Sequence, residues 1–571
     1  MSASLSFSLE PMPGEIRTKS EIERLASPVV RTLCKELGVF SLIARMCPVQ
    51  FDDGSAGVCV LSDHYHDDQT IALLQLLKQR GYRLNARAVL VLSPALLIEV
   101  TKSVRAFSPA SPVLSEHPTH GSALAMAMNA ILIWGLRHRA SDIHFNVRRL
   151  LSESSVMFTI DGRYVCPEIY AHLPTATMLA MLAVTWMDVE GGNGAVFDPT
   201  IEQQGKISRE LDGQRVSLRW ASLATDQGPS VCLRILVLDS KDLTPELTEL
   251  GYADSQVADL RRASLSQGGA IVLAGTVGSG KSTTLATLMR EIPVDRKIIT
   301  LEDPAEYFIP NALQNTVSRS SDENEMSVFD NKLKAFKRSA MNDLLLGEIR
   351  DAAGGRAFSD LAGTGISLYT TVHAGSALLV PERLSSSFIG VPRDLLATPG
   401  ILKLVVFQCL LPRVCRGCAV TYEQILCMPS WKCSQSQVRS LQWKREWLAA
   451  LEHASGLSLE RLRFRSEKGC ARCSNGLPAL LGTSGRTVAA EFIEPASEPE
   501  FLAGLKTSDG LSLHRWFERR ERSPLASADM SGKSVRECAL HKVWTGQIDP
   551  RTHEQFFGVN HVKGSAVHAL V

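Results

Sequence analysis

Residues 275–282 read GTVGSGKS, and their types and spacing are those of a loop that binds phosphate groups. The glycines of such a loop let successive backbone N–H groups turn inward around phosphate oxygens, and a following helix adds its positive end. We expect Lys281 to neutralise the β and γ phosphates and Ser282 to ligate Mg²⁺ through its hydroxyl. The predicted phosphate-binding set is Gly275, Thr276, Val277, Gly278, Ser279, Gly280, Lys281, Ser282 and Thr283.

The segments on both sides of this loop have the patterns that the motif requires. Residues 270–274 (AIVLA) form an apolar run typical of a buried strand, and residues 282–290 (STTLATLMR) have helical spacing. A glycine-rich turn can match the motif by chance, but a strand before it and a helix after it make that the weaker interpretation. The sequence therefore predicts a nucleotide-binding α/β domain.

Acidic residues follow two further predicted strands, and a histidine follows a third. The strands are 297–301 (KIITL), 344–346 (LLL) and 366–372 (ISLYTTV). A bound nucleotide needs carboxylates at neighbouring strand ends, to hold Mg²⁺ through water and to orient the attacking water. The histidine either senses the γ phosphate or makes structural hydrogen bonds, and spacing does not choose between the two. The catalytic candidates are Glu302, Asp303, Glu306, Glu348 and His373.

Four of the 13 cysteines form two closely spaced pairs. Cys415 and Cys418 stand in CRGC, and Cys470 and Cys473 stand in CARC. Two thiolate pairs with this spacing can close a tetrahedral Zn²⁺ site and fold an insertion that is too small for its own core. Redox or coincidental pairing is the weaker alternative. The start of the chain lacks the basic and apolar regions of a secretory signal, which favours reduced thiols or metal ligands over disulfides.

The elements that must position these residues fall into three parts along the 571 residues. Short strands and a helix predict an α/β module over residues 1–110, and a Pro- and Ser-rich stretch at 108–120 is typical of a linker. Alternating apolar stretches predict a mixed α+β domain with an antiparallel sheet over residues 121–240. Over residues 243–571 apolar strands alternate with helices, which predicts a parallel sheet covered on both faces. The cysteine pairs place a zinc insertion near residues 412–475.

Individual elements support this division. Strands are expected at 56–61, 88–92, 156–160, 215–220 and 231–237, and helices at 70–80 and 122–136. The apolar helix at 122–136 is too short to span a bilayer and contains Asn129, so we expect it to be buried. The polar stretch at 318–330 is expected to be a surface loop.

The charge balance argues against a polyanionic partner. Lys and Arg total 61 and Asp and Glu total 60, so the formal net charge is +1. No global field then favours nucleic acid or anionic lipid, and no direct contact with nucleic acid is expected. Since no run reaches the roughly 18 apolar residues that a membrane span needs, the sequence predicts a cytoplasmic protein.

The order of the motifs resembles that of the secretion ATPase superfamily of type II secretion, type IV pilus and type IV secretion systems. GTVGSGKSTT, TLEDPAEY, LLLGEIRD and TTVHA stand where that family has its Walker A motif, aspartate box, Walker B motif and histidine box. ASDIHF, TIDGRY and RVSLRW look like the family's second N-terminal domain. Residues 27–107 look like the first N-terminal domain, a docking module for partners, so the resemblance covers roughly four fifths of the chain.

The resemblance implies a RecA-like P-loop ATPase domain that works as a homo-hexamer with ATP, Mg²⁺ and Zn²⁺. By similarity, Arg215, Arg219 and Arg234 would reach the nucleotide; without the family they are typical of solvated strand positions. Assembly ATPases of type II secretion and pilus extension carry a tetracysteine insertion, whereas retraction ATPases typically do not. The implied function is ATP hydrolysis that powers type IV pilus assembly or type II-like secretion, at the inner membrane, through a platform protein.

Other functions remain open at this point. The chain could be a type IV secretion or conjugation motor, or a nucleotide-binding scaffold with weak hydrolysis. A nucleic-acid motor shares the RecA-like core, but a net charge near zero argues against it.

Three positions depart from the family's pattern. The family's Walker A motif usually has Pro-Thr where this chain has Thr276 and Val277, a change that the phosphate cradle should tolerate. Its Walker B motif usually follows Asp-Pro-Asp, and here the stretch is AMND, so the carboxylate expected beside the Mg²⁺ water shell is either Asn342 or a shifted Asp343. A histidine that usually follows Thr-Gly is Ile366 here. These departures put fast turnover in doubt.

Overall fold

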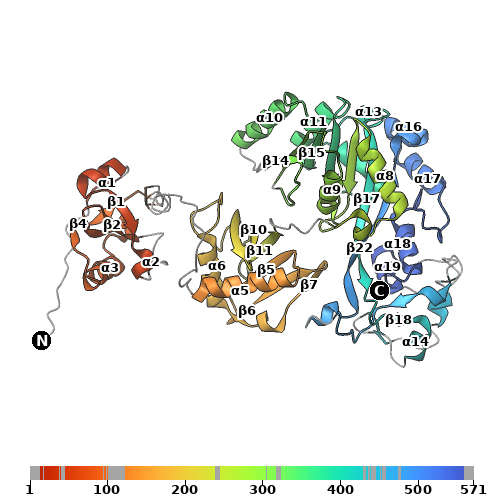
Figure 1. The fold of residues 1–571 in the computed structure, drawn as a ribbon. Helices are drawn as coiled ribbons and strands as arrows, with labels where there is room; N and C mark the ends of the chain where they lie inside the picture. Colours follow the sequence, from red (N-terminus) through yellow and green to blue (C-terminus); the bar gives the residue numbers. More distant parts are fainter. Residues whose placement is uncertain are drawn as a thin grey trace. The chain divides into compact units, whose positions relative to one another are not determined.

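The computed structural model describes residues 13–16, 19–37, 39, 46–93, 96, 97, 100, 123–237, 245–303, 305–316, 323–428, 432–434, 437, 438, 445–449, 452, 458–473 and 477–558. The chain divides into two compact units, one formed by residues 1–128, 179–205 and 222–224 and the other by the remaining residues. Three large sheets organise the chain, and each is described by itself (Figure 1).

The first sheet lies in the N-terminal part and has the strand order β1-β2-β3-β4. β2 is antiparallel to both β1 and β3, whereas β3 and β4 are parallel. Parallel neighbours need a crossover connection, and α3 supplies it between β3 and β4. The elements are α1 (Lys19–Leu25), β1 (Val29–Thr32), α2 (Cys34–Leu37), β2 (Met46–Phe51), β3 (Ala56–Val60), α3 (Asp68–Gln79) and β4 (Leu84–Val91). The two strands and the helix expected here are confirmed.

The second sheet has seven strands in the order β7-β6-β5-β11-β10-β9, with β8 paired to β6. The pairs of β5 with β6 and β11, and of β6 with β7 and β8, are antiparallel, as expected. Trp134 of α5 packs against Phe158 of β6, with ring centroids 4.4 Å apart. The elements are α5 (Ala123–Arg137), β5 (Asp142–Asn146), β6 (Glu153–Ile160), β7 (Arg163–Val165), β8 (Leu173–Pro174), α6 (Thr175–Trp186), β9 (Gln204–Leu211), β10 (Gln214–Leu223) and β11 (Ser230–Val237).

The third sheet also has seven strands, in the order β14-β13-β15-β16-β12-β17-β22. The first six of these strands run parallel, and β22 is antiparallel to β17. The strands are β12 (Ala270–Ala274), β13 (Ile298–Glu302), β14 (Ala312–Thr316), β15 (Asp343–Glu348), β16 (Ser367–Val372), β17 (Leu402–Val414) and β22 (Thr483–Ile493). The parallel arrangement is as expected, and the antiparallel edge strand is a feature that the sequence pattern does not predict.

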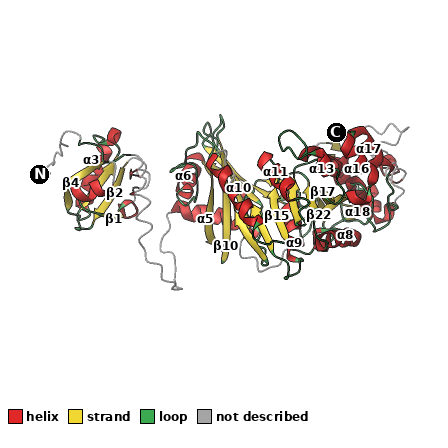
Figure 2. Cartoon of the chain, turned by 90° about the horizontal axis from the view of Figure 1, so that it is seen from above, coloured by secondary structure: helices red, strands yellow, loops and turns green. Residues whose placement is uncertain are grey.

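Helices cover both faces of the third sheet (Figure 2). Along β12, Ala270, Val272 and Ala274 join one apolar core, and Ile271 and Leu273 join another. The first core includes residues of α10 (Glu323–Lys337), α11 (Ala352–Leu361), α12 (Val380–Leu384), α13 (Arg393–Leu396), α16 (Pro499–Thr507) and α17 (Gly510–Arg519). The second includes α7 (Leu247–Leu250), α8 (Asp254–Leu265) and α9 (Lys281–Arg290). This two-sided burial explains why β12 is apolar throughout rather than alternating.

A small cysteine-bearing insertion connects β17 to β22. Its described elements are β18 (Val420–Thr421), α14 (Tyr422–Cys427), β19 (Lys432–Ser434), β20 (Gln437–Val438) and β21 (Arg463–Phe464). β18 pairs with β21, so the two ends of the insertion lie together. An apolar core joins it to α18 (Val535–Trp544) and α19 (Pro550–Phe557). Phe464 and Trp447 lie in the same cluster as Val543 of α18, and Phe557 of α19 packs against that cluster.

Two expectations about connecting segments have different outcomes. The predicted linker at 108–120 lies outside the described residues. The predicted surface loop at 318–330 is wrong from Glu323 onward, because α10 begins there. Phe329 and Leu333 of α10 are buried in the core against the sheet, so this segment is an amphipathic helix whose first residues are polar.

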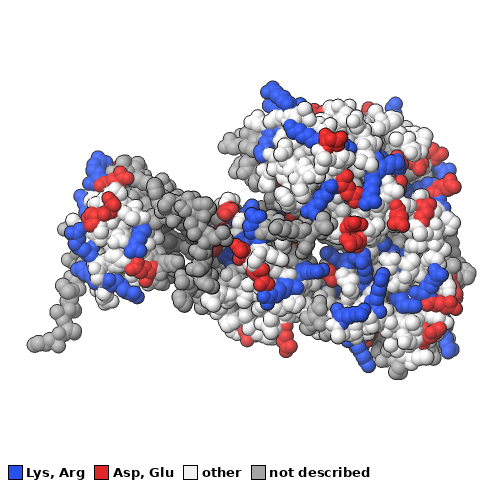
Figure 3. Space-filling model, in the orientation of Figure 1, with Lys and Arg blue, Asp and Glu red and all other residues white. Residues whose placement is uncertain are grey.

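The surface agrees with the near-zero net charge. On the face drawn in Figure 3, basic and acidic side chains are interspersed on each of the described parts. Among the described residues, no helix is long and apolar enough to cross a bilayer.

Candidate functional site

The loop between β12 and α9 has a backbone that only glycine can adopt at its critical positions. Gly275, Gly278 and Gly280 have φ values of 155°, 75° and 84°. A Cβ on Gly275 would lie 2.4 Å from the Ser279 Oγ and 2.5 Å from the backbone oxygen of Gln408, so no side chain fits. β12 ends at Ala274 and α9 begins at Lys281, as the sequence predicts. The loop therefore has the strand, the turn and the helix start that a phosphate-binding loop needs.

Lys281 lies in the loop with its ammonium group held by backbone. Its Nζ donates to the carbonyl oxygens of Gly275 at 2.9 Å and Thr276 at 3.0 Å. Burial lowers the pKa of Lys281, and the negative charges of Glu348 and Glu306 act in the opposite direction. The cation thus lies within the field of two of the predicted acids.

The residues of the loop fit a phosphate-bearing ligand. Among the described residues, the buried Oγ of Ser279 has no hydrogen-bond partner. No atom lies within 4 Å of the position that a Cβ on Gly278 would occupy, so space is open beside the loop. An orphaned hydroxyl, an adjacent ammonium and a helix start are groups that phosphate oxygens would satisfy.

The predicted acids and histidine converge on the same edge of the sheet as the loop. Because the strands are parallel, Ala274 pairs with Val372, and Glu348 pairs with Thr371, at their carboxyl ends. His373 follows Val372 and joins the motifs, since its Nε2 lies 3.0 Å from the Glu348 Oε1 and its Nδ1 lies 3.1 Å from the Gly275 oxygen. Both partners are acceptors, so both ring nitrogens donate only when His373 is an imidazolium.

The acids of the aspartate box have three different surroundings. Asp303 is paired with Arg350 of the Walker B segment at 2.6 Å. Glu302 accepts a hydrogen bond from the Gln314 Nε2 at 3.2 Å, and burial raises the pKa of Glu302. Glu306 is the one of the three whose charge acts on Lys281.

Asn342 and Asp343 lie at the opposite edge of the sheet from the phosphate loop. Asp343 is the first residue of β15 and Glu348 is the last, so the strand separates them. Asp343 is fully buried, accepts from the Arg296 Nε at 2.8 Å and from the Tyr369 hydroxyl at 3.1 Å. Asn342 accepts from the backbone nitrogen of Lys297 at 2.8 Å. The expectation that either residue would lie beside the Mg²⁺ water shell is therefore wrong, because both lie at the amino end of β15, away from the phosphate loop.

The three arginines expected near the nucleotide belong to the second sheet. Arg215 and Arg219 lie in β10, and Arg234 lies in β11. The Arg234 Nε donates to the Asp142 Oδ1 at 2.9 Å, across the pair of β11 with β5. Arg234 is thus held by a neighbouring carboxylate and is not merely solvated.

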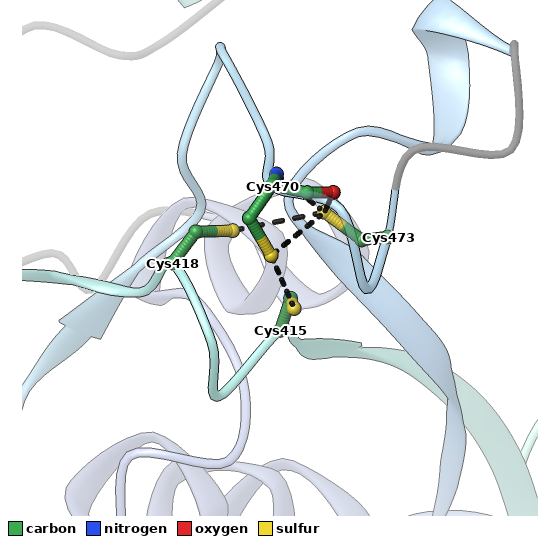
Figure 4. Close-up of side chains that lie close together, drawn as sticks. All are labelled: Cys415, Cys418, Cys470 and Cys473. Carbon is green, nitrogen blue, oxygen red and sulfur yellow. Dashed lines mark hydrogen bonds between the residues drawn. The ribbon is translucent and has the colours of Figure 1, made fainter.

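The four paired cysteines come together in one cluster, although 55 residues separate the two pairs. Figure 4 shows their sulfur atoms converging, and all four ligand atoms lie within 4.8 Å of one another. The Sγ–Sγ distances are 3.8 Å for Cys415 and Cys470, 3.7 Å for Cys418 and Cys473, and 3.9 Å for Cys470 and Cys473. A tetrahedral zinc with Zn–S bonds of about 2.3 Å places its sulfurs about 3.8 Å apart. The donor set therefore fits Zn²⁺.

Comparison with known proteins decides the family. A family model described as type II/IV secretion system protein matches residues 119–521, which is more than half of the chain. The chain belongs to this family. The resemblance inferred from the order of its motifs is thus confirmed.

Individual relatives of this secretion-system chain match part of its length. The type II secretion system protein E of Dickeya dadantii is 32% identical over 298 residues, or 52% of this chain and 56% of that protein. The type IV pilus assembly ATPase PilB of Thermus thermophilus is 29% identical over 282 residues, or 49% of this chain and 30% of that protein. The matched part of the chain thus spans about half of the length of the first of these curated relatives and less than a third of the length of the second. The Legionella pneumophila ATPase DotB has a TM-score of 0.46 at 17% identity, covering 77% of this chain and 97% of that chain.

The structure of this secretion-system protein adds residues that sequence reasoning missed. Arg350 stands inside the GEIRD motif, two residues after Glu348, and pairs with Asp303. Gln408 is fully buried on β17 and donates through its Nε2 to the backbone oxygen of Ser279 at 2.8 Å. A polar residue inside the apolar run LKLVVFQCLL is a signal that could have singled it out, because buried amides require partners.

Proposed function

We propose that this chain is an ATP-hydrolysing motor whose nucleotide binds at the loop between β12 and α9 with Mg²⁺. The observation that carries the proposal is the position of His373, which contacts both the Glu348 carboxylate and the Gly275 oxygen. This contact links the Walker B acid directly to the phosphate loop. The names of the relatives support the same chemistry, since PilB of Thermus thermophilus is named an ATPase.

The residues of the site have distinct proposed roles. Lys281 would leave the carbonyls of Gly275 and Thr276 for phosphate oxygens, and Ser282 would ligate Mg²⁺. Bound Mg²⁺ supplies electrostatic stabilisation of the charge that develops on the phosphates. Glu348 would orient the attacking water, held in place by His373.

The remaining candidates would support this core. Thr276, Val277, Gly278, Ser279, Gly280 and Thr283 complete the proposed nucleotide site. Glu302, Asp303 and Glu306 would shape the water shell of Mg²⁺, and burial raises the pKa of Glu302.

We further propose three domains, at residues 1–110, 121–240 and 243–571, and a resident zinc in the insertion near 412–475. By analogy with the family, the chain would assemble as a homo-hexamer, with Arg215, Arg219 and Arg234 reaching the nucleotide. Domain closure driven by hydrolysis would act on an inner-membrane platform protein from the cytoplasmic side. The tetracysteine cluster favours pilus assembly or type II-like secretion.

Phosphate release from ATP tests the motor. We expect the full chain to release phosphate. The Lys281→Ala and Glu348→Gln variants should release phosphate at least about a hundredfold more slowly than the wild type. Lys337→Ala is the matched control, because Lys337 is a half-exposed lysine of the same domain paired with Asp360. A Lys281→Ala protein that hydrolyses ATP at the wild-type rate would refute the proposal. Light scattering with nucleotide would contradict the hexamer if it found only the mass of one chain.

A His373→Ala variant tests the link between motifs. Loss of the imidazole leaves Glu348 without its 3.0 Å partner, so we expect phosphate release to slow roughly tenfold to a hundredfold while nucleotide affinity changes little. An equal loss of affinity and rate would instead indicate that His373 maintains the loop through Gly275.

The positions of Asn342 and Asp343 remove the reason for proposing a scaffold with weak hydrolysis. That alternative rested on the altered residues Asn342 and Asp343, and these lie at the far edge of the sheet from Lys281 and Glu348. The type IV secretion alternative is separated by deletion in the native host, where loss of surface pili or of a secreted enzyme would favour the proposed role over conjugation.

A further inference from the structure

A buried polar relay lies behind the phosphate loop, on the strand β17. Gln408 is fully buried, and its Nε2 donates to the Ser279 oxygen at 2.8 Å. Its Oε1 accepts from the Tyr252 hydroxyl at 2.6 Å, and Tyr252 is also buried. The Tyr252 oxygen lies 3.2 Å from the Thr284 Oγ1 in α9. The relay thus runs from the segment before α8, through β17, to Ser279 in the loop and to Thr284 in α9.

The donors and acceptors of this relay have only one consistent arrangement. A backbone oxygen only accepts, so the Gln408 amide nitrogen must face Ser279 and its oxygen must face Tyr252. Tyr252 gives its single proton to Gln408, and Thr284 therefore donates to Tyr252. Burial raises the pKa of Tyr252, so it remains a donor at neutral pH. The direction of every bond is fixed by the protein alone.

The phosphate loop approaches β17 closely at Gln408. A Cβ on Gly275 would be 2.5 Å from the backbone oxygen of Gln408, and a Cβ on Gly280 would be 3.4 Å from the Gln408 Nε2. In a planar peptide the C=O of one residue and the N–H of the next point in opposite directions. Holding the Ser279 oxygen on Gln408 therefore turns the Gly280 N–H away from β17.

We propose that Gln408 is a positioning residue for nucleotide binding, which presets the loop so that the Gly280 N–H faces the phosphate, and that Tyr252 fixes the orientation of the Gln408 amide. The inference rests on the proposed function, because it assumes that the loop binds a nucleotide. Gln408 acts through Ser279 and Gly280 and does not itself touch the ligand. Without it, the Ser279 carbonyl is free to turn into the space that phosphate oxygens need, and a buried acceptor loses its donor.

Binding of a fluorescent ADP analogue to the full chain tests the proposal. We expect Gln408→Leu to weaken this binding about tenfold, and Tyr252→Phe, which removes only the hydroxyl, to weaken it about threefold. Cys409→Ala is the matched control, because Cys409 is the next residue of β17 and packs against another apolar cluster than the one that contains Tyr252. We expect it to bind as the wild type does. For ATP hydrolysis, KM should rise in the Gln408 variant by more than kcat falls.

The outcomes separate this inference from the proposed function. If the wild type does not bind the analogue, nucleotide binding itself fails. If the wild type binds and Lys281→Ala does not, but Gln408→Leu binds as tightly as the wild type, the relay is refuted alone. A lower melting temperature with unchanged affinity would likewise show a merely structural role. If Gln408→Leu does not fold, Tyr252→Phe decides, and wild-type affinity in that variant overturns the relay.

A double variant tests whether the two side chains act together. In the Gln408→Leu background, Tyr252→Phe should cause no further loss of affinity, because its partner is already absent. Independent losses that multiply would contradict a relay.

Discussion

Truncation of Asp343 gives a sharp test of where the structure places this residue. Asp343→Ala breaks a buried ion pair, since Asp343 is fully buried and the Arg296 side chain is 14% exposed. It also removes one of the two acceptors of the Tyr369 hydroxyl, which retains the Ser264 backbone oxygen at 3.2 Å. Breaking a buried pair by removing one partner costs about 3–5 kcal/mol. Arg296 retains the oxygens of Ser264 and Ser367 as acceptors, so we expect the lower end, about 3 kcal/mol.

Urea unfolding of the full chain measures this loss, and the Mg²⁺ dependence of phosphate release measures any effect on catalysis. The matched control is Asp360→Ala, which breaks the exposed pair of Asp360 with Lys337 and should cost less than about 1 kcal/mol. The Mg²⁺ concentration for half-maximal activity should be the same in all three proteins. A tenfold higher Mg²⁺ requirement in Asp343→Ala, with an unchanged urea midpoint, would refute the assignment of Asp343 to the structural edge of the sheet.

Two further predictions concern the metal and the pH dependence of stability. Cys470→Ser should lose the one zinc per chain that elemental analysis of the wild type should find, whereas the exposed Cys427→Ser should keep it; equal zinc in both would contradict the cluster as the site. Burial raises the pKa of Glu554 to about 7, while its Oε1 accepts from the Trp447 Nε1 at 2.7 Å. Since the unfolded carboxyl ionises near its ordinary value of 4.5 and the folded one only near 7, stability should fall as the pH rises between these values. Glu554→Gln should therefore match the wild type near pH 4.5 and exceed it by about 1–3 kcal/mol at pH 8, and a constant difference in urea unfolding across this range would contradict the reasoning.

Local sequence signals predict which residues gather at the edge of the sheet beside the phosphate loop. Glu348 and His373 each come after an apolar run that is typical of a buried strand, and parallel strands bring their carboxyl ends together. The cysteine spacing succeeds for a different reason. Two C-x2-C pairs are typical ligands of a single tetrahedral zinc site. The sequence therefore predicts that the pairs lie together, although 55 residues separate them.

Sequence reasoning fails where the answer depends on which end of an element a residue occupies, or on a distant partner. Asp343 stands near Glu348 in the sequence, but a strand of six residues carries the two to opposite edges of the sheet. Gln408 meets Ser279 from 129 residues away, and no local pattern reports that contact. The polar residues at the start of α10 favoured a surface loop over a helix, because the apolar face of α10 is recognised only where it packs on the sheet.

The hairpin of β17 and β22 has a consequence for the order in which the chain folds. These strands pair from Val405 with Ile493 to Val414 with Thr483, so residues 415–482 form the loop that must close before the edge of the sheet is complete. Closing a flexible loop of that length costs roughly 4 kcal/mol of chain entropy. Cys415 and Cys473 sit close to the two ends of this loop. Capture of the proposed zinc by the nascent chain would close this loop early, and zinc starvation would then delay completion of the sheet that carries Gln408.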